Sequence, residues 1–336
     1  MSKIRKTCLV TGGAGFIGAH VVESLIEMNQ HVIVLDDLSG GYAENIHADA
    51  TFIQGSIVDH QLVSKIFEEH NIDLVYHLAA YAAEGLSHFI KRFNYNNNLI
   101  GSVNLINESV KHGIERFIFT SSIAVYGEGQ LPMHEKLRPL PEDPYGIAKY
   151  AVEQELKVTN DMFGLDYTIF RPHNVYGEYQ NIADRYRNVI GIFMNQILQN
   201  KPLTVFGDGN QKRAFSYIGD VAPYIAQSAF NKKSKNQIIN IGADQEYTIK
   251  ELAETVIKEF GRDDVKLTHL PARNEVLDAY ANHEKAAQIF NINTYTSLED
   301  GIAKMAKWVN SHGARATPKF QNIELYDKLP PIWLED

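Results

Sequence analysis

The sequence predicts an α/β fold built on a doubly wound parallel sheet, followed by a smaller α/β unit. Three observations lead to this prediction. Strand signals alternate with amphipathic helix signals from the first residues onward, which is typical of parallel strands joined by crossover helices. A glycine-rich turn joins the first expected strand to the first expected helix. The alternation weakens after Arg171-Pro172, where we expect the second unit to begin.

Most of the expected sheet lies in the first half of the chain. The expected strands are 7–10, 31–35, 51–54, 74–78, 116–120 and 167–170, and the expected helices are 16–28, 58–69, 96–112 and 145–163. We expect 221–229 and 237–241 to return to the sheet and helices 189–199 and 249–260 to lie outside it. Residues 318–336 contain three prolines and little periodicity, which predicts an irregular tail strapped over the surface.

These elements divide the 336 residues into two units, a division that the length of the chain allows. The sheet domain takes residues 1–170 and a return segment at about 214–242. The smaller unit takes residues 171–213 and 243–336.

Composition excludes several classes of protein. A formal net charge of -9 argues against general binding to nucleic acid or to an anionic membrane surface. No apolar run reaches the roughly 18 residues of a membrane-spanning helix, and the first apolar stretch is too short for a signal peptide. The single cysteine, Cys8, cannot form an internal disulfide, which fits a reducing compartment. We therefore expect a cytoplasmic protein.

The glycine-rich turn predicts a dinucleotide site. Gly12, Gly15 and Gly18 follow a predicted strand and open a predicted helix, and Gly13-x-Gly15-x-x-Gly18 also fits the dinucleotide fingerprint. The glycines of such a turn allow a tight bend, close approach of the backbone to a pyrophosphate, and close packing of helix on strand. The helix N-terminus adds N–H donors and the positive end of a dipole.

A carboxylate after the second strand indicates which dinucleotide binds. Asp36 stands where a side chain can accept hydrogen bonds from both ribose hydroxyls, and it would repel a 2′-phosphate. NAD is therefore expected rather than NADP. Asp37 is the alternative ribose ligand, or else a solvated turn residue.

Tyr145 and Lys149 lie one helical turn apart and predict an acid/base pair. A phenol titrates near ~10, so a base at neutral pH needs a pKa lowered by about three units, roughly 4 kcal/mol. A lysine ammonium on the same helix face favours the phenolate by its charge. Many surface helices carry such a pair, so the prediction depends on the glycine turn upstream.

Further motifs occur along nearly the whole chain, from Thr11 to about Trp308. They are His77-Leu78-Ala79-Ala80, Asn98-x-x-Gly101, Thr120-Ser121-Ser122 with Val125-Tyr126-Gly127, Arg171-Pro172-His173-Asn174-Val175-Tyr176-Gly177, Phe206-Gly207-Asp208-Gly209, and Arg213 before Asp220. In this order and spacing they resemble the extended short-chain dehydrogenases/reductases, specifically the nucleotide-sugar epimerases and dehydratases similar to UDP-glucose 4-epimerase. The resemblance implies a Rossmann-type sheet domain and a second domain that binds a nucleotide-diphosphate sugar.

The resemblance implies roles around the cofactor. Lys149 would bind the nicotinamide ribose and lower the pKa of Tyr145, and Asn98 would position the active-site loop. Ser56 and Ile57 would lie along the adenine edge, although relatives often have Asp in place of Ser56. The other cofactor contacts implied are Phe16, Ile17, Leu78, Ala79 and Ala80.

The resemblance also implies roles around the substrate. Tyr145 would be the acid/base and Ser122 would hydrogen-bond the reacting oxygen of the sugar. Asn174, Arg213 and Arg273 would hold the diphosphate, the arginines as planar forks matched to phosphate. Val189 and Val205 belong to segments that would wrap the nucleotide base.

Three of these positions have simpler structural explanations that stay open. Asn98 serves only the fold in one reading, and Arg213 is a surface ion pair in another. His77, at the end of a strand, is expected to be a packed core histidine rather than a catalyst.

By resemblance, members of this group first oxidise the sugar at C4, and further groups then decide the outcome. The dehydratases have acids where this chain has Ile123 and Ala124, and the decarboxylases usually have Glu at the position of Ala124. The 3,5-epimerases use a cysteine, but Cys8 lies in the first strand. The resemblance therefore implies C4 epimerisation with NAD retained. A dehydrogenase that releases the ketone and a non-catalytic NAD-sensing protein remain as alternatives.

Two further expectations follow. Glu84 and His88, after the fourth strand, either read a particular sugar, support a second chemical step, or are ordinary surface residues. Apolar positions on helices 96–112 and 145–163 exceed what one sheet can cover, and the resemblance implies that these helices pair across a two-fold axis as a four-helix bundle.

Overall fold

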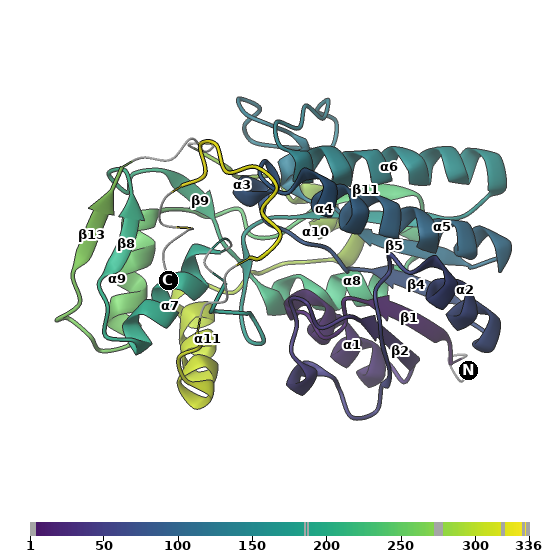
Figure 1. Ribbon diagram of the computed structural model, residues 1–336, viewed down its shortest axis with the longest axis horizontal. Helices are drawn as coiled ribbons and strands as arrows, with labels where there is room; N and C mark the ends of the chain where they lie inside the picture. Colours follow the sequence, from purple (N-terminus) through teal and green to yellow (C-terminus); the bar gives the residue numbers. More distant parts are fainter. Residues whose placement is uncertain are drawn as a thin grey trace.

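The computed structural model describes residues 5–184, 186, 188–271, 278–316, 320–330 and 333. Its centre is a seven-stranded sheet in the order β11-β6-β5-β4-β1-β2-β3, with every neighbouring pair parallel (Figure 1). The strands are β1 (Thr7–Thr11), β2 (His31–Asp36), β3 (Thr51–Gln54), β4 (Leu74–His77), β5 (Arg116–Thr120), β6 (Tyr167–Pro172) and β11 (Gln237–Ile241). This is the predicted doubly wound α/β fold, with the strand order reversing between β1 and β4.

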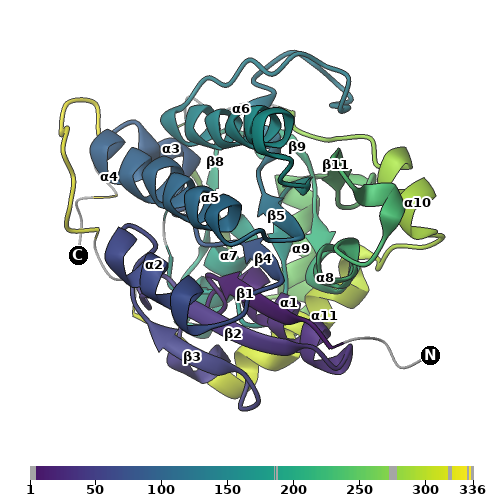
Figure 2. The same ribbon diagram turned by 90° about the vertical axis from the view of Figure 1, so that its right-hand side faces the viewer.

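Helices cover both faces of the sheet because alternate strand residues point to opposite sides. Leu9 and Ile33 pack with one set of helices, whereas Val10 and Val34 pack with the other. The first set is α2 (His60–Glu69), α5 (Gly101–Lys111) and α6 (Pro144–Phe163). The second set is α1 (Phe16–Glu27), α8 (Ala222–Ser228) and α10 (Glu284–Phe290). Figure 2 shows the two layers on either side of the strands.

The predicted helix boundaries hold except where polar residues begin a helix. The helix expected from residue 58 starts at His60, because the Asp59 carboxylate accepts hydrogen bonds from Gln61 N and Leu62 N and so caps α2. The helix expected from residue 96 was placed too late. It begins as α4 (Lys91–Tyr95), passes through a π turn at Asn96–Ile100 and continues as α5. Its polar asparagines obscured the apolar periodicity.

A second core lies beside the sheet and is built from three helices and short strands. The helices are α7 (Val189–Leu198), α9 (Ile249–Glu259) and α11 (Leu298–His312), and the strand pairs are β8 (Leu203–Phe206) with β13 (Leu267–Leu270), β9 (Lys212–Ala214) with β12 (Glu246–Thr248), and β7 (Val175–Tyr176) with β10 (Ser216–Tyr217). Buried Phe193, Leu252 and Met305 join the three helices. Helix α10 packs on the sheet, although residues 243–336 are predicted to belong to the smaller unit. The division of the chain into two units stays a prediction.

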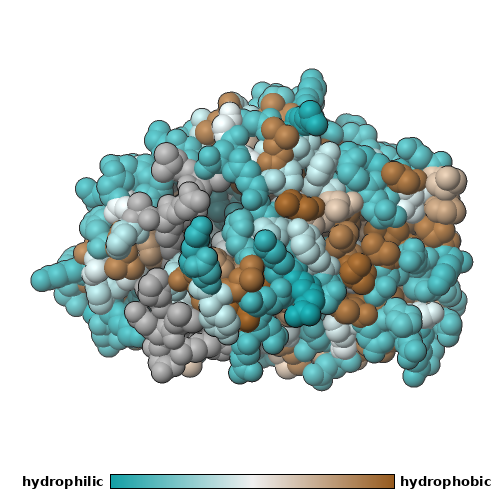
Figure 3. Space-filling view, turned by 45° about the horizontal axis from the view of Figure 1, so that its top comes forward, coloured by the Kyte–Doolittle hydropathy of each residue, from teal (hydrophilic) through white to brown (hydrophobic). Residues whose placement is uncertain are grey.

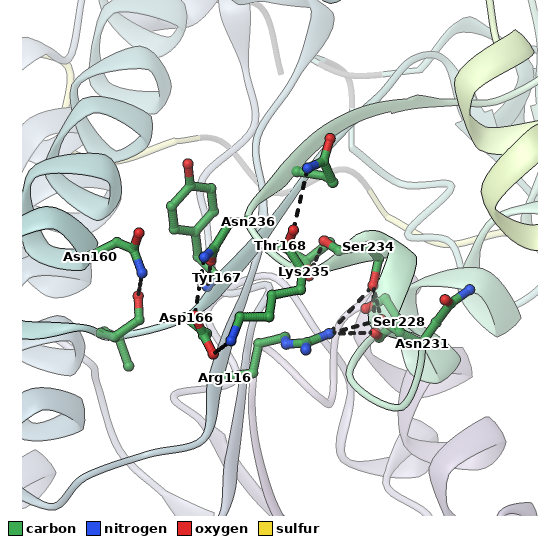
Figure 4. Close-up of polar contacts among 12 residues, drawn as sticks. Arg116, Asn160, Asp166, Tyr167, Thr168, Ser228, Asn231, Ser234, Lys235 and Asn236 are labelled. Atoms are coloured by element: carbon green, nitrogen blue, oxygen red, sulfur yellow. Dashed lines mark hydrogen bonds and ion pairs between the residues drawn. The ribbon is translucent and has the colours of Figure 1, made fainter.

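The amino ends of β5, β6 and β11 are tied by a polar cluster, here called the amino-edge cluster (Figure 4). Arg116 Nη1 donates to Ser228 O at 3.0 Å and to Asn231 O at 3.1 Å. Asp166 accepts from Asn236 Nδ2 at 3.1 Å and pairs with Lys235 at 2.6 Å. These bonds fasten the returning segment that carries β11 to the body of the sheet.

The described part of the tail, residues 320–330, is here called the strap. It has no regular helix or strand along its described length and lies against α3 (Glu84–Ser87) and α4, as the yellow ribbon in Figure 1 shows. The Glu324 carboxylate accepts hydrogen bonds from Arg92 N at 3.0 Å and Phe93 N at 2.9 Å, which caps α4. In the described part of the chain, no helix is long and apolar enough to cross a membrane.

Candidate active site

A large cavity opens at the carboxyl ends of the strands, where doubly wound sheets bind their ligands. Its volume of about 2020 Å³ exceeds the roughly 300–1,000 Å³ of a site for one drug-sized ligand, so it has room for more than one such ligand. The predicted residues that line it are Gly12, Gly15, Phe16, Ile17, Gly18, Asp36, Asp37, Ser56, Ile57, Leu78, Ala79, Ala80, Glu84, Ser122, Tyr145, Lys149, Asn174, Val189, Val205 and Arg213. Arg273 lies outside the described residues.

The glycine turn between β1 and α1 has the shape of a pyrophosphate cradle. Gly12 has φ +76°, and a Cβ there would lie 2.6 Å from Ala79 N. A Cβ on Gly18 would lie 2.0 Å from Gly12 O, so α1 packs against the turn only without a side chain. Gly15 is the N-cap of α1 and has no side chain to cover the helix N-terminus. The residues therefore fit a dinucleotide, with backbone N–H groups facing its phosphates.

Asp36 is the better placed of the two predicted ribose ligands. Its carboxylate accepts hydrogen bonds from Ala14 N at 3.0 Å and Leu38 N at 2.8 Å. Burial raises the pKa of Asp36, and these backbone bonds oppose that effect. A carboxylate offers about four acceptor sites, so about two remain for ribose hydroxyls. Asp37 is exposed at the cavity wall and accepts from Ser39 N at 2.9 Å, which favours a turn role for it over a ribose ligand.

The residues expected near the adenine and the loop have distinct positions. Ile57 is buried at the cavity wall, and Ser56 Oγ accepts from Val58 N at 3.3 Å. Asn98 is buried behind the wall rather than facing the cavity. Its side chain donates to Tyr81 O at 3.0 Å and accepts from Tyr81 N at 2.8 Å. This geometry favours the loop-positioning role of Asn98 over direct contact with a cofactor.

The expected catalytic side chains converge from two elements. Ser122 follows β5, and its Oγ accepts from Ala124 N at 3.1 Å. Tyr145 lies in the first turn of α6, a helix that Asp143 caps by accepting from Gly146 N at 2.9 Å. Lys149 Nζ donates to Thr120 O at 2.8 Å and lies 5.8 Å from the centre of the Tyr145 ring. Segments after β5 and at the start of α6 therefore bring all three side chains to the wall of one cavity.

Lys149 is buried, and its protonation is balanced near neutral pH. Burial lowers the pKa of Lys149 to about 7, while the Glu153 carboxylate opposes this by its charge. Glu153 is itself held by Arg171, at 2.8 Å to Nε and 2.5 Å to Nη2, and by Ser121 Oγ at 2.6 Å. This support for Lys149 was not predicted from the sequence. Its only signal was the Arg171-Pro172 motif.

His77 is a packed core histidine, as predicted. Its ring nitrogens contact Thr11 Oγ1 at 2.8 Å and Ser102 Oγ at 2.7 Å, and burial holds the pKa of His77 well below its usual range. Within the described ranges, no group of three or more His, Cys, Asp or Glu side chains is arranged to hold a metal ion.

The cavity is also lined by residues expected around a nucleotide sugar. Asn174 has φ +40°, and its Nδ2 donates to Ala214 O at 3.1 Å. Arg213, the preceding residue on β9, also lines the cavity. Val189 begins α7 at the cavity wall, whereas the side chain of Val205 is buried in the second core.

The strap forms a part of the wall that was not expected, through Leu325, Asp327 and Lys328. Glu84 and His88 of the α3 segment, which were expected near the sugar, are exposed and line the cavity as well. The tail was predicted to cover the surface, but its packing on α3 depends on apolar contacts of Leu329 and neighbouring aromatic residues, which have no periodic signal in the sequence.

A parallel sheet, a glycine cradle at a helix N-terminus and a Ser–Tyr–Lys set beside it define the class of dinucleotide-dependent enzymes with a Rossmann domain. A family model described as the NAD dependent epimerase/dehydratase family matches residues 8–242. The chain belongs to this family.

The similarity to individual relatives extends over nearly the whole length of both chains. A putative UDP-glucose 4-epimerase of Methanocaldococcus jannaschii is 36% identical over 306 residues, which cover 90% of this chain and 98% of the relative. The UDP-glucose 4-epimerase of Thermotoga maritima, solved with UDP-glucose, has a TM-score of 0.87 and 34% identity, covering 91% of this chain and 99% of its own. A UDP-N-acetyl-alpha-D-glucosaminuronate decarboxylase of Bacillus cytotoxicus is 30% identical over 91% of this chain and 98% of its own. These relatives agree on nucleotide sugars and differ in the reaction.

Proposed function

We propose that the protein is an NAD-dependent UDP-sugar 4-epimerase that acts through a transient 4-keto sugar. The observation that carries the proposal is the cavity end formed by Ser122, Tyr145 and Lys149, with Ile123 and Ala124 lining it in place of acids. Those two side chains supply no carboxylate for elimination of water or for assisting decarboxylation. The uridine nucleotide is proposed because the relatives named above are UDP-sugar enzymes.

The residues that would hold NAD are the glycine turn with the α1 N-terminus for the pyrophosphate, Asp36 for the adenosine ribose and Lys149 for the nicotinamide ribose. The chemistry that bound NAD supplies is the reversible acceptance of a hydride.

Tyr145 and Ser122 handle the proton and the oxygen at sugar C4. The Tyr145 phenolate takes the proton of the 4-hydroxyl and becomes a phenol, which returns the same proton when the alcohol forms again. The Ser122 hydroxyl donates a hydrogen bond to that oxygen, and the ammonium of Lys149 favours the phenolate. With the proton returned to the oxygen from which it came, the reaction has no net proton or redox change.

Inversion requires the keto sugar to present its other face to the nicotinamide while Asn174 and Arg213 keep hold of the diphosphate. The cavity of about 2020 Å³ is compatible with this requirement, because it is larger than a site for one small ligand. Incubating the protein with a panel of UDP-sugars that differ at C2 and C6, without added NAD, and following the mixture by proton NMR tests the proposal. A C4 epimer appearing from at least one of them is the expected result, and no conversion of any would overturn it.

We further propose a homodimer that pairs α5 and α6 with the same helices of a second copy. Exposed apolar side chains lie along α6 at Ile147, Val158, Met162 and Phe163. Ile100 is exposed just before α5. Figure 3 shows hydrophobic side chains gathered on the side that carries these helices. Val158, Met162 and Phe163 are 60–70% exposed, so a lone chain would present them to water. A monomer in light scattering at micromolar concentration would contradict this proposal.

A further inference from the structure

Three segments far apart in the sequence bring two histidines and an aspartate together beside the cavity. His173 follows β6 and lines the cavity, His283 precedes α10, and Asp244 follows β11. His173 Nε2 lies 3.0 Å from His283 Nε2, and His283 Nδ1 lies 2.6 Å from Asp244 Oδ1. Both histidines are buried, whereas the Asp244 side chain is 62% exposed. The three side chains form a hydrogen-bonded series from the cavity wall to solvent.

The contacts fix which nitrogens carry protons. His173 Nδ1 faces Ala214 O at 3.2 Å, and a carbonyl oxygen only accepts, so this nitrogen donates. A ring that donates from Nδ1 leaves Nε2 as an acceptor when it is neutral, and burial lowers the pKa of His173 to about 3. His283 Nε2 must therefore donate to His173. Its Nδ1 must also donate, because the neighbour there is the Asp244 carboxylate.

The Ala214 carbonyl connects this series of side chains to the expected diphosphate site. It accepts from His173 Nδ1 at 3.2 Å and from Asn174 Nδ2 at 3.1 Å. Asn174 has a positive φ, which costs an asparagine little but still needs support from its surroundings. Ala214 also follows Arg213 directly on β9. Whatever fixes this carbonyl therefore orients the Asn174 side chain that donates to it and the β9 backbone that carries Arg213.

We propose that Asp244, His283 and His173 form a hydrogen-bonded strut that positions Asn174 and Arg213 to bind the diphosphate of the substrate. The inference rests on the proposed function, because it assigns the diphosphate to these two residues. The strut does not touch the Ser122, Tyr145 and Lys149 set, so it acts on substrate affinity rather than on the chemical step. All three members are positioning residues.

The test measures UDP affinity by calorimetry on the purified protein with its bound cofactor, together with kcat and KM for the UDP-sugar that is turned over. His283→Phe removes both donors, Asp244→Asn removes the anionic end, and His283→Gln keeps one N–H donor. His60→Gln, on an exposed histidine at the start of α2, is the matched control. Thermal unfolding and bound cofactor are recorded for each variant, so that loss of fold is recognised.

We expect His283→Phe to weaken UDP binding about tenfold and raise KM similarly, because the buried acceptor of His173 loses its partner. We expect kcat within about twofold of wild type, partial recovery in His283→Gln, and no change in His60→Gln. UDP affinity within about twofold of wild type in both His283→Phe and Asp244→Asn overturns the strut. A fall in kcat at unchanged KM overturns it as well.

A spectroscopic measurement keeps the proposal testable if His283→Phe does not fold. Nitrogen-15 NMR of the histidine rings should show the hydrogen bond between the His283 and His173 rings in the wild type, with the His283 Nδ1 resonance shifted in Asp244→Asn. His283 resonances that do not change in Asp244→Asn overturn the strut. Absence of any UDP binding by the wild type would instead contradict the proposed function, so the two failures are distinguishable.

Discussion

The two edges of the central sheet both bury polar and charged side chains, but they use them differently. At the amino edge, Arg116 and Asp166 find their partners within the chain, in Ser228, Asn231, Lys235 and Asn236. At the carboxyl edge, Asp36, Tyr145 and Lys149 combine internal hydrogen bonds with faces that line the cavity. A buried polar side chain can therefore fasten strands together as well as bind a ligand. The two edges differ because only the polar side chains of the carboxyl edge also face a cavity.

Tyr145→Phe tests the carboxyl edge and should give the largest effect. It removes one oxygen and should lower the rate by about 10²–10⁴, the range for loss of a general acid/base, while the fold and bound NAD remain. Steady-state turnover of a UDP-sugar measures this. Tyr150→Phe, on the same helix but outside the cavity, is the control and should be near wild type. Activity of Tyr145→Phe within a few-fold of wild type would assign the base to another group.

Arg116→Ala tests the amino edge, where we expect the opposite pattern. It removes the charged donor shared by the carbonyls of Ser228 and Asn231, which keep only neutral donors such as Ser234 Oγ, and this loss should lower the free energy of unfolding by about 1–3 kcal/mol. Turnover at a temperature where the variant is folded should stay within a few-fold of wild type. Denaturant unfolding measures the loss, and Arg262→Ala, an exposed arginine paired with Asp264, is the control. A stable but inactive Arg116→Ala protein would contradict the structural role assigned to the amino edge.

Burial of Lys149 beside the cavity makes the stability of the protein depend on pH. Its pKa is lowered to about 7 in the folded protein from 10.5, so between these values the unfolded chain binds a proton that the folded protein does not. Stability of the NAD-free protein should therefore rise with pH in this window, by up to about 1.4 kcal/mol per pH unit from this residue. Lys149→Met should lose that slope and Lys157→Met should keep it. Equal slopes in wild type and Lys149→Met would contradict the prediction.

Asp36→Ala should give a smaller effect, on cofactor choice. Removal of the carboxylate abolishes both the ribose hydrogen bonds and the repulsion of a 2′-phosphate, so the preference for NAD over NADP should shrink by about tenfold or more. Calorimetry with both dinucleotides measures the change. Asp37→Ala is the matched control, because its exposed carboxylate serves a turn. The opposite pattern in these two variants would make Asp37 the ribose ligand.

Local patterns in the sequence predicted the sheet and many of the residues that line the cavity. Apolar runs such as 31–35 and the spacing of Tyr145 and Lys149 are short-range signals, and they predicted the strands and the helix that carries both side chains. Long-range pairs leave no such signal. His173 and His283 lie 110 residues apart, and Glu153 with Arg171 gives no periodicity that distinguishes a buried pair from two surface residues. The strap escaped prediction as a cavity wall for the same reason, because its contacts with α3 are tertiary.

The fate of hydrogen at C4 tests the proposed epimerisation most directly. A UDP-sugar carrying deuterium at C4 is incubated with the purified protein in ordinary water without added NAD, and the product is analysed by mass spectrometry and NMR. We expect an inverted C4 that keeps its deuterium, with no net NADH, because Ile123 and Ala124 supply no carboxylate for eliminating water and the hydride returns to the carbon that it left. Loss of the mass of water, loss of carbon dioxide, or stoichiometric NADH with a released keto sugar would contradict it.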